Sequence, residues 1–166
     1  MTHRVGWLDP VFVFLSFVGT YGLVWIAIAA LVAVVWRRPG VLMLVLASAL
    51  VSEAVSSGLR AAVGRPRPPL RAPEPEPLVA VPHSGSFPSG HATTSFACAT
   101  ALVFAAPRRS LPFFVLAAAI AFSRIYVGVH YPLDVLGGAA LGIGIAIALR
   151  TLPATLRRSL STLRSS

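Results

Sequence analysis

The chain has 166 residues, of which 56% are hydrophobic and only 11% are charged. Soluble domains average about 25% charged residues, so this composition excludes an ordinary soluble domain and predicts a polytopic membrane protein. The net charge is +9, and every basic residue counted in it is an arginine. Arginine pairs such as Arg37-Arg38 and Arg108-Arg109 follow apolar segments, which favours membrane flanks over a nucleic-acid surface.

The amino-terminal apolar stretch, Val11 to Trp36, contains no charged residue. As one helix it would be ~39 Å long, which exceeds the ~30 Å hydrocarbon core. We therefore expect a short interfacial helix over Asp9–Val18, bent near Gly19 or Gly22 into a first membrane crossing. A cleaved signal peptide is the alternative, but the apolar stretch is too long for one.

Four further apolar segments follow, at residues 41–63, 91–106, 111–127 and 135–149. The predicted fold is therefore all-α: a single-domain helical bundle over 1–166 with five transmembrane helices and an amino-terminal interfacial helix. Five crossings place the two ends on opposite sides. The arginine pairs predict a cytoplasmic carboxyl end with a basic tail at 150–166, and an amino end outside.

Two segments would then face outwards, the loop 64–88 and the short turn 128–134. The loop holds seven of the chain's fourteen prolines between Pro66 and Pro82, which favours an extended, semi-rigid spacer over a peptide-recognition motif. Gly138 and Gly142 lie four residues apart and allow close helix approach, either within the bundle or between two copies.

The sequence FPSGHA opens the segment that begins at residue 91. Ser89 is a natural N-cap, and Gly90 allows the backbone to approach another group closely. Free backbone N–H groups and the positive end of the helix dipole form an anion site at such a helix start. Simple capping of a membrane helix is the alternative, and His91 beside this helix start favours the anion site.

The sequence RAAVGRPRP places Arg60 and Arg67 seven residues apart, with Arg65 and Arg71 nearby. A basic patch for lipid headgroups would explain them. We favour a clamp for a phosphate group, because the guanidinium group is planar, permanently charged and suited to bidentate phosphate binding.

The sequence SRIYVGVHYPLD places Arg124 near the same outer face and sets His130 and Asp134 four residues apart, on one helix face. If Asp134 accepts the Nδ1 proton of His130, the Nε2 atom is free to attack an electrophile. The pair alone is a weak signal, but a second histidine and the arginine cluster on the same face strengthen it.

These three motifs, in this order, resemble the signature motifs of the type-2 phosphatidic-acid phosphatase superfamily. The family includes bacterial lipid phosphatases, undecaprenyl-diphosphatases and vanadate-dependent haloperoxidases. The resemblance implies that His130 is the nucleophile, Asp134 its orienter and His91 the general acid. It implies phosphate binding by five residues, namely Arg60, Arg67, Ser89, Gly90 and Arg124. It implies no metal and no cofactor.

Two features depart from the family pattern. The first motif usually begins with lysine, whereas this chain has Arg60, and larger members have six crossings. Glu53 lies inside the second apolar segment, seven residues before Arg60. It could support the site, but hydrogen bonding to Ser52, Ser56 or a neighbouring helix is the interpretation we favour.

The sequence thus predicts a metal-independent phosphatase of the cytoplasmic membrane whose site faces outwards. Its substrate would be a lipid phosphate or diphosphate, cleaved through a phosphohistidine, with a polyprenyl diphosphate favoured and phosphatidic acid or phosphatidylglycerol phosphate as alternatives. The expected partners are this lipid and the bilayer, not nucleic acid. A non-catalytic lipid-phosphate binder or flippase is the alternative of another class, and a vanadate peroxidase is a third.

Overall fold

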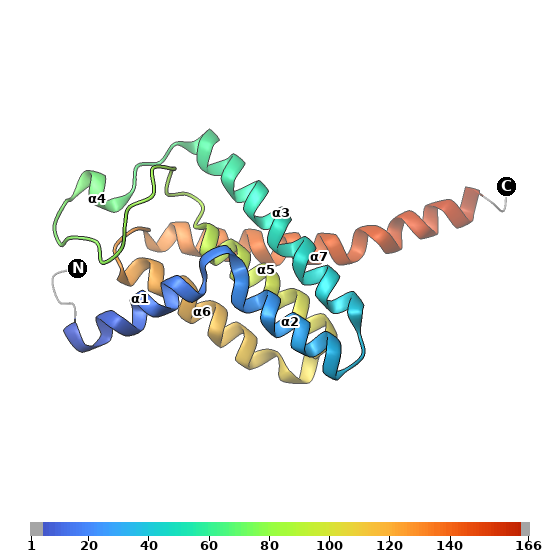
Figure 1. Ribbon diagram of the computed structural model, residues 1–166. Helices are drawn as coiled ribbons and strands as arrows, with labels where there is room; N and C mark the ends of the chain where they lie inside the picture. Colours follow the sequence, from blue (N-terminus) through green and yellow to red (C-terminus); the bar gives the residue numbers. More distant parts are fainter. Residues whose placement is uncertain (1–4, 164–166) are drawn as a thin grey trace.

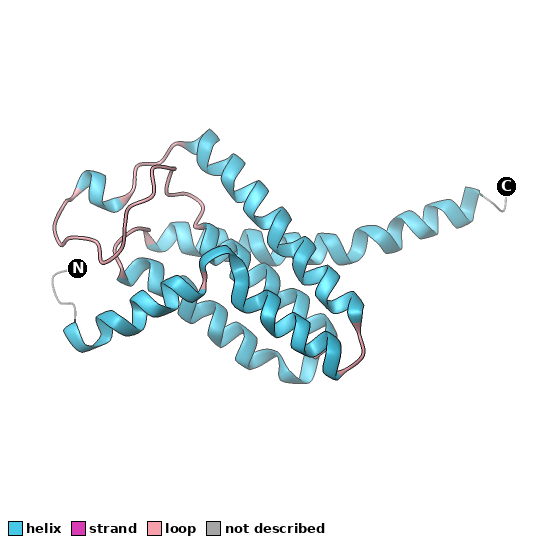
Figure 2. Ribbon diagram, in the orientation of Figure 1, coloured by secondary structure: helices cyan, strands magenta, loops and turns pink. Residues whose placement is uncertain are grey.

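A computed structural model describes residues 5–163, and within this range the protein is helical and contains no strand (Figure 2). The α-helices are α1 (Asp9–Val18), α2 (Leu23–Val35), α3 (Pro39–Val63), α4 (Pro68–Arg71), α5 (Gly90–Ala105), α6 (Ser110–Tyr126) and α7 (Pro132–Leu163). Short 3-10 turns occupy Gly6–Leu8, Thr20–Gly22 and Pro107–Arg109. The all-helical fold class is therefore confirmed.

Helix α5 is the centre of the bundle, and α3, α6 and α7 pack around it (Figure 1). Its buried side chains are almost all small, which lets the neighbouring helices approach closely. On α7, a methyl group at Gly138 would lie 2.7 Å from the carbonyl oxygen of Ser89, and one at Gly142 would fall on the carbonyl oxygen of Thr93. The two glycines therefore serve internal packing of α7 against α5.

The largest apolar cluster lies between α2, α3, α5 and α6. Its buried members include Trp25, Val45, Leu102 and Ile120. Trp25 is fully buried, and its indole N–H donates a hydrogen bond of 3.2 Å to Ser95 of α5. This cluster holds together the helices whose ends carry the polar motifs.

The segment from α3 to α5, the turn from α6 to α7 and the start of α1 gather at one end of the bundle (Figure 1). Backbone hydrogen bonds join these segments. The N–H of Leu78 donates to Val127, and the N–H of Ser89 donates to Asp134, at 3.1 and 2.9 Å. All three sequence motifs therefore meet at this end.

Two helical stretches of the described chain, Pro39–Arg71 and Pro132–Thr151, are long and apolar enough to cross a membrane. The pair Gly6–Val18 and Leu23–Val35 would add a third as one span bent by 64°, and Ser110–Tyr126 is a shorter apolar helix. The protein thus has membrane-capable helices, and the count of five crossings stays a prediction.

The element boundaries agree with the sequence in most places. Helix α1 occupies the expected residues, and the chain bends after it, with Gly22 at a φ of 69°. The loop 64–88 is not wholly extended, because residues 68–71 form α4, whose first two residues are prolines compatible with a helix start. Helix α7 continues to Leu163, so most of the expected tail is helical.

Candidate active site

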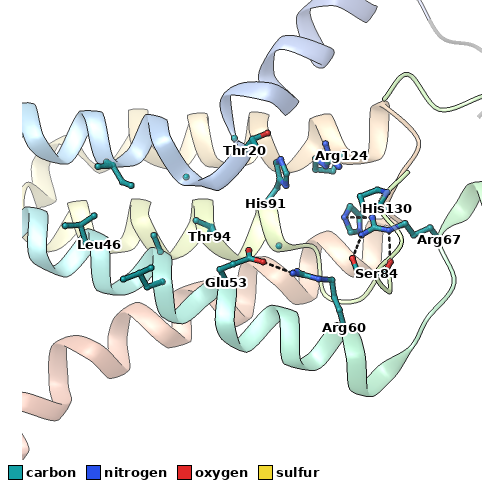
Figure 3. A pocket seen from close by; sticks show the side chains of 17 residues that line it. Thr20, Leu46, Glu53, Arg60, Arg67, Ser84, His91, Thr94, Arg124 and His130 are labelled. Atoms are coloured by element: carbon teal, nitrogen blue, oxygen red, sulfur yellow. Dashed lines mark hydrogen bonds and ion pairs between the residues drawn. The ribbon is translucent and has the colours of Figure 1, made fainter. Parts of the chain in front are cut away.

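A cavity of about 550 Å³ lies at the end of the bundle where the three motifs meet (Figure 3). Five of its charged or titratable lining residues were predicted site residues, namely Arg60, Arg67, His91, Arg124 and His130. Gly90 also lines it, and so does Glu53. The structure therefore brings two imidazoles and three guanidinium groups, from all three sequence motifs, around one space.

The start of α5 approaches Arg60 closely. A side chain at Gly90 would place its Cβ 2.7 Å from Nη1 of Arg60, so only glycine leaves room for the guanidinium group. Ser89 occupies the N-cap position, as expected, but its side chain makes no capping bond. The hydroxyl of Ser89 is instead buried without a hydrogen-bond partner among residues 5–163, and Ser89 does not line the cavity.

Arg67 fixes the position of His130. Its Nη1 atom donates to the carbonyl oxygen of Val129 at 3.0 Å and contacts Nε2 of His130 at 3.1 Å. Because a guanidinium group can only donate, Nε2 must accept, and the proton of the neutral imidazole then lies on Nδ1. The other Arg67 nitrogens donate to Ser84 and Gly85, which ties the long loop to the α6–α7 turn.

The Nδ1 atom of His130 faces Asp134. Its distance to Oδ2 of Asp134 is 3.5 Å, which is too long for a good hydrogen bond, so the contact is electrostatic. Burial lowers the pKa of His130 to about 4, and the charges of Arg67 and Arg124 act in the same direction, whereas Asp134 opposes them. His130 is therefore neutral at pH 7, with its reactive lone pair on Nε2.

Helix α1 contributes an unexpected residue, Ser16, which does not line the cavity itself but contacts two residues that do. Its hydroxyl contacts Nη1 of Arg124, and its carbonyl oxygen accepts a hydrogen bond of 3.1 Å from Nε2 of His91. A carbonyl oxygen can only accept, so Nε2 of His91 carries a proton. Arg124 and His91 are thereby oriented by a helix that precedes all three motifs.

Arg60 is paired with Glu53, two turns earlier on α3. Nη2 of Arg60 donates to Oε1 of Glu53 at 2.9 Å, and Nη1 contacts the hydroxyl of Ser56 at 3.1 Å. From the sequence we favoured a hydrogen bond between Glu53 and Ser52, Ser56 or a neighbouring helix. This is wrong for the Glu53 carboxylate, which pairs with Arg60 of its own helix. Two long side chains span the ~10 Å rise of seven helical residues.

The charges of the site do not cancel. Arg60 is paired with Glu53 and Arg65 with Asp134, but Arg67 and Arg124 have no carboxylate within ion-pair distance in the described part of the chain. Nε of Arg60 and Nε of Arg124 are also buried and have no hydrogen-bond partner among the described residues. Buried donors of this kind cost free energy unless a ligand satisfies them, and an anion with about two negative charges fits this balance.

Comparison with known proteins assigns the family. The family model of the PAP2 superfamily matches residues 41–158. The chain belongs to this superfamily. The resemblance drawn from the three motifs is thereby confirmed, and α1, which carries Ser16, lies outside the matched range.

Two relatives of this PAP2 protein are named as a phosphatase and a diphosphatase. It is 38% identical over 133 residues to decaprenylphosphoryl-5-phosphoribose phosphatase of Mycobacterium tuberculosis, covering 77% of this chain and 71% of the relative. It is 40% identical over 78 residues to undecaprenyl-diphosphatase BcrC of Bacillus subtilis, covering 42% of this chain and 40% of that relative.

Two solved structures have the same fold. The crystal structure of Aquifex aeolicus LpxE matches with a TM-score of 0.74 and 27% identity, covering 89% of this chain and 88% of that one. A PAP2-type phosphatidylglycerolphosphate phosphatase from Bacillus subtilis matches with a TM-score of 0.72 and 27% identity, covering 92% of this chain and 79% of that one. The helical arrangement of this PAP2 protein is thus that of membrane phosphatases.

Sequence reasoning missed the site partners Ser16 and Arg65, and it misjudged Glu53. The seven-residue spacing of Glu53 and Arg60, which puts both on one helix face, could have indicated their ion pair. Arg65 was grouped with the phosphate clamp, but neither it nor Arg71 lines the cavity. No sequence signal connects Ser16 with Arg124, because 108 residues separate them.

Proposed function

We propose that this protein is a metal-independent membrane phosphatase that hydrolyses a lipid phosphate or diphosphate through a phosphohistidine. One observation carries the proposal: His130, His91 and the three cationic side chains from separate segments line one cavity, with two guanidinium groups lacking a carboxylate partner in the described part of the chain. A terminal phosphate supplies the missing negative charge, and its oxygens accept from Arg60, Arg67 and Arg124.

His130 acts as the nucleophile. Nε2 attacks the phosphorus, the P–N bond forms, and the bond from phosphorus to the leaving oxygen breaks. For this attack to occur, Nη1 of Arg67 must move away from Nε2 of His130, which it contacts at 3.1 Å, and bind a phosphate oxygen instead. Asp134 stabilises the positive charge that develops on the imidazole, since its Oδ2 faces Nδ1.

His91 acts as the general acid. Its Nε2–H is engaged by the carbonyl oxygen of Ser16, so the proton given to the leaving oxygen is the one on Nδ1 of the imidazolium form. A bound phosphate favours that form through its negative charge. After the lipid leaves, neutral His91 takes a proton from water, and the hydroxide displaces the phosphate from His130.

A polyprenyl diphosphate is the favoured substrate. Relatives named undecaprenyl-diphosphatase in Bacillus subtilis and Sulfolobus acidocaldarius support it. The latter is 29% identical over 150 residues. Phosphatidylglycerol phosphate and phosphatidic acid are the alternatives, and the structural match to a phosphatidylglycerolphosphate phosphatase supports the first of these. Rates of phosphate release from matched micelles of the three lipids would rank them. A higher rate with a two-chain phospholipid would overturn the choice of a polyprenyl diphosphate as the substrate.

The decisive experiment compares two histidine variants. His130→Ala should abolish phosphate release from purified protein in detergent, whereas His83→Ala, which alters an exposed histidine of the loop, should not. With a substrate labelled on its terminal phosphate, acid-labile label should remain on the wild type and not on His130→Ala. Equal release by the wild type and His130→Ala would favour the non-catalytic binder.

We also propose that the chain is one membrane domain over 1–166, with five crossings, an outward-facing site and a cytoplasmic carboxyl end. In a Cys98→Ala background, a cysteine introduced at Pro75 should react with an impermeant maleimide in intact cells. One introduced at Arg108, between α5 and α6, should react only after lysis. The reverse pattern would invert the topology.

A further inference from the structure

One arginine of the first motif lies outside the cavity. Nη1 of Arg65 donates to Oδ1 of Asp134 at 2.7 Å, which is a short, charge-assisted bond. Arg65 is absent from the cavity lining, so it does not reach the space where the phosphate would bind. Its charge is directed at the carboxylate that faces His130.

Asp134 depends on its polar neighbours because its side chain has no exposure to solvent. Oδ1 is held by Arg65, and Oδ2 accepts the backbone N–H of Tyr131 at 2.9 Å and faces Nδ1 of His130. A buried carboxylate without a cationic partner is strongly disfavoured. Without Arg65, the carboxylate could rotate towards the imidazole, take up a proton or draw in water.

Arg65 is itself held firmly for a loop residue. Its guanidinium group stacks on the ring of Tyr131, with its central carbon 4.3 Å from the ring centroid. Its carbonyl oxygen accepts the N–H of Ser86 at 2.8 Å. The chain between α3 and α4 is thus fastened to both the long loop and the start of α7.

From these contacts we propose that Arg65 is a positioning residue, which acts through Asp134 to orient His130 for attack. This inference rests on the proposed phosphatase function. It gives the four arginines between residues 60 and 71 different roles. Arg60 and Arg67 face the phosphate, Arg65 faces the orienting carboxylate, and Arg71 does neither.

The test combines kinetics with a double-mutant cycle. Arg65→Gln should lower kcat about tenfold or more with KM changed less than about threefold, since the residue acts on the reacting imidazole and not on bound substrate. Arg65→Lys should recover part of that loss by restoring a charge. In an Asp134→Asn background, Arg65→Gln should have almost no further effect, because the group through which it acts is gone. Arg71→Gln is the matched control and should leave kcat unchanged.

A binding measurement separates this role from a general loss of structure. Inorganic phosphate, titrated calorimetrically, should bind Arg65→Gln as it binds the wild type, whereas Arg124→Gln should weaken binding clearly. Additive losses in the double mutant, or loss of phosphate binding in both arginine variants, would overturn the role of Arg65. If the wild type were active and Arg65→Gln had the same kcat as Arg71→Gln, the role of Arg65 would be overturned and the proposed phosphatase function would stand. A wild type that releases no phosphate would remove the proposed function and this inference with it.

Discussion

Replacing Arg67 by lysine should destabilise the folded protein even though the charge is retained. The Arg67 side chain is almost fully buried and makes five contacts, with the carbonyl oxygens of Ser84, Gly85 and Val129, the hydroxyl of Ser84 and Nε2 of His130. These contacts come from three nitrogens in one plane, which point in different directions. A lysine ammonium group offers three donors from a single atom.

The magnitude follows from the contacts that are lost. At least two of the five cannot be remade, and the acceptors left behind are buried. Each such loss costs about 1–3 kcal/mol, so the free energy of unfolding should fall by about 2–6 kcal/mol. For a chain of this length, 1 kcal/mol corresponds to about 2–4 °C in the unfolding midpoint, so the midpoint should fall by at least about 4 °C.

The assay is thermal unfolding of purified protein in one detergent, without substrate. Arg71→Lys is the matched control, because Arg71 is exposed and its side chain forms no hydrogen bond or ion pair with the described residues. Its midpoint should stay within about 1 °C of the wild type. If Arg67→Lys unfolded at the same temperature as this control, the five contacts would not hold the loop to the α6–α7 turn, and the reasoning would be refuted.

Four other outcomes are expected. Gly142→Ala should lower the unfolding midpoint clearly, because its methyl group meets the Thr93 backbone, whereas Gly144→Ala, with open space around it, should not. Burial lowers the pKa of His130 from 6.5 to about 4, so the protein should lose stability as the pH falls from 6.5 to 4, and His130→Gln should lose less. Unfolding midpoints that fall in parallel with pH in the two proteins would contradict this. Asp134→Asn should lower kcat more than it raises KM, and a pure KM effect would count against an orienting role. Excess chelator should leave phosphate release unchanged, and a loss restored by magnesium would overturn the metal-free mechanism.

The sequence predicted the elements well because their signals are local. Apolar stretches of membrane length are separated by arginine pairs, prolines and glycines, and these fix where helices begin and end. Helix α1 was expected at its observed residues for this reason, and α5 within one residue. Helix α7 was expected too short, because beyond Leu149 polar and basic residues replace the apolar pattern although the backbone continues as a helix.

Side-chain partnerships were harder to predict because they depend on how helices lie against one another. Ser89 has the right residue type and position for a cap, yet its hydroxyl makes no capping bond. Arg65 and Arg67 are two residues apart and were expected to share one role, but the backbone directs one to Asp134 and the other to His130. Residue type gives the chemistry of a group, whereas packing gives its partner.

By itself, the sequence determined that this protein is a helical membrane protein, that it carries the three PAP2 motifs, and which histidines and arginines are candidates for phosphate chemistry. These features follow from composition and short spacings, which are properties of the chain alone. Only the tertiary structure decided that Ser16 contacts Arg124 and His91, that Glu53 pairs with Arg60, and that Arg65 donates a hydrogen bond to Asp134. Such contacts depend on helix packing and on which way each side chain points, and spacing along the chain does not encode either.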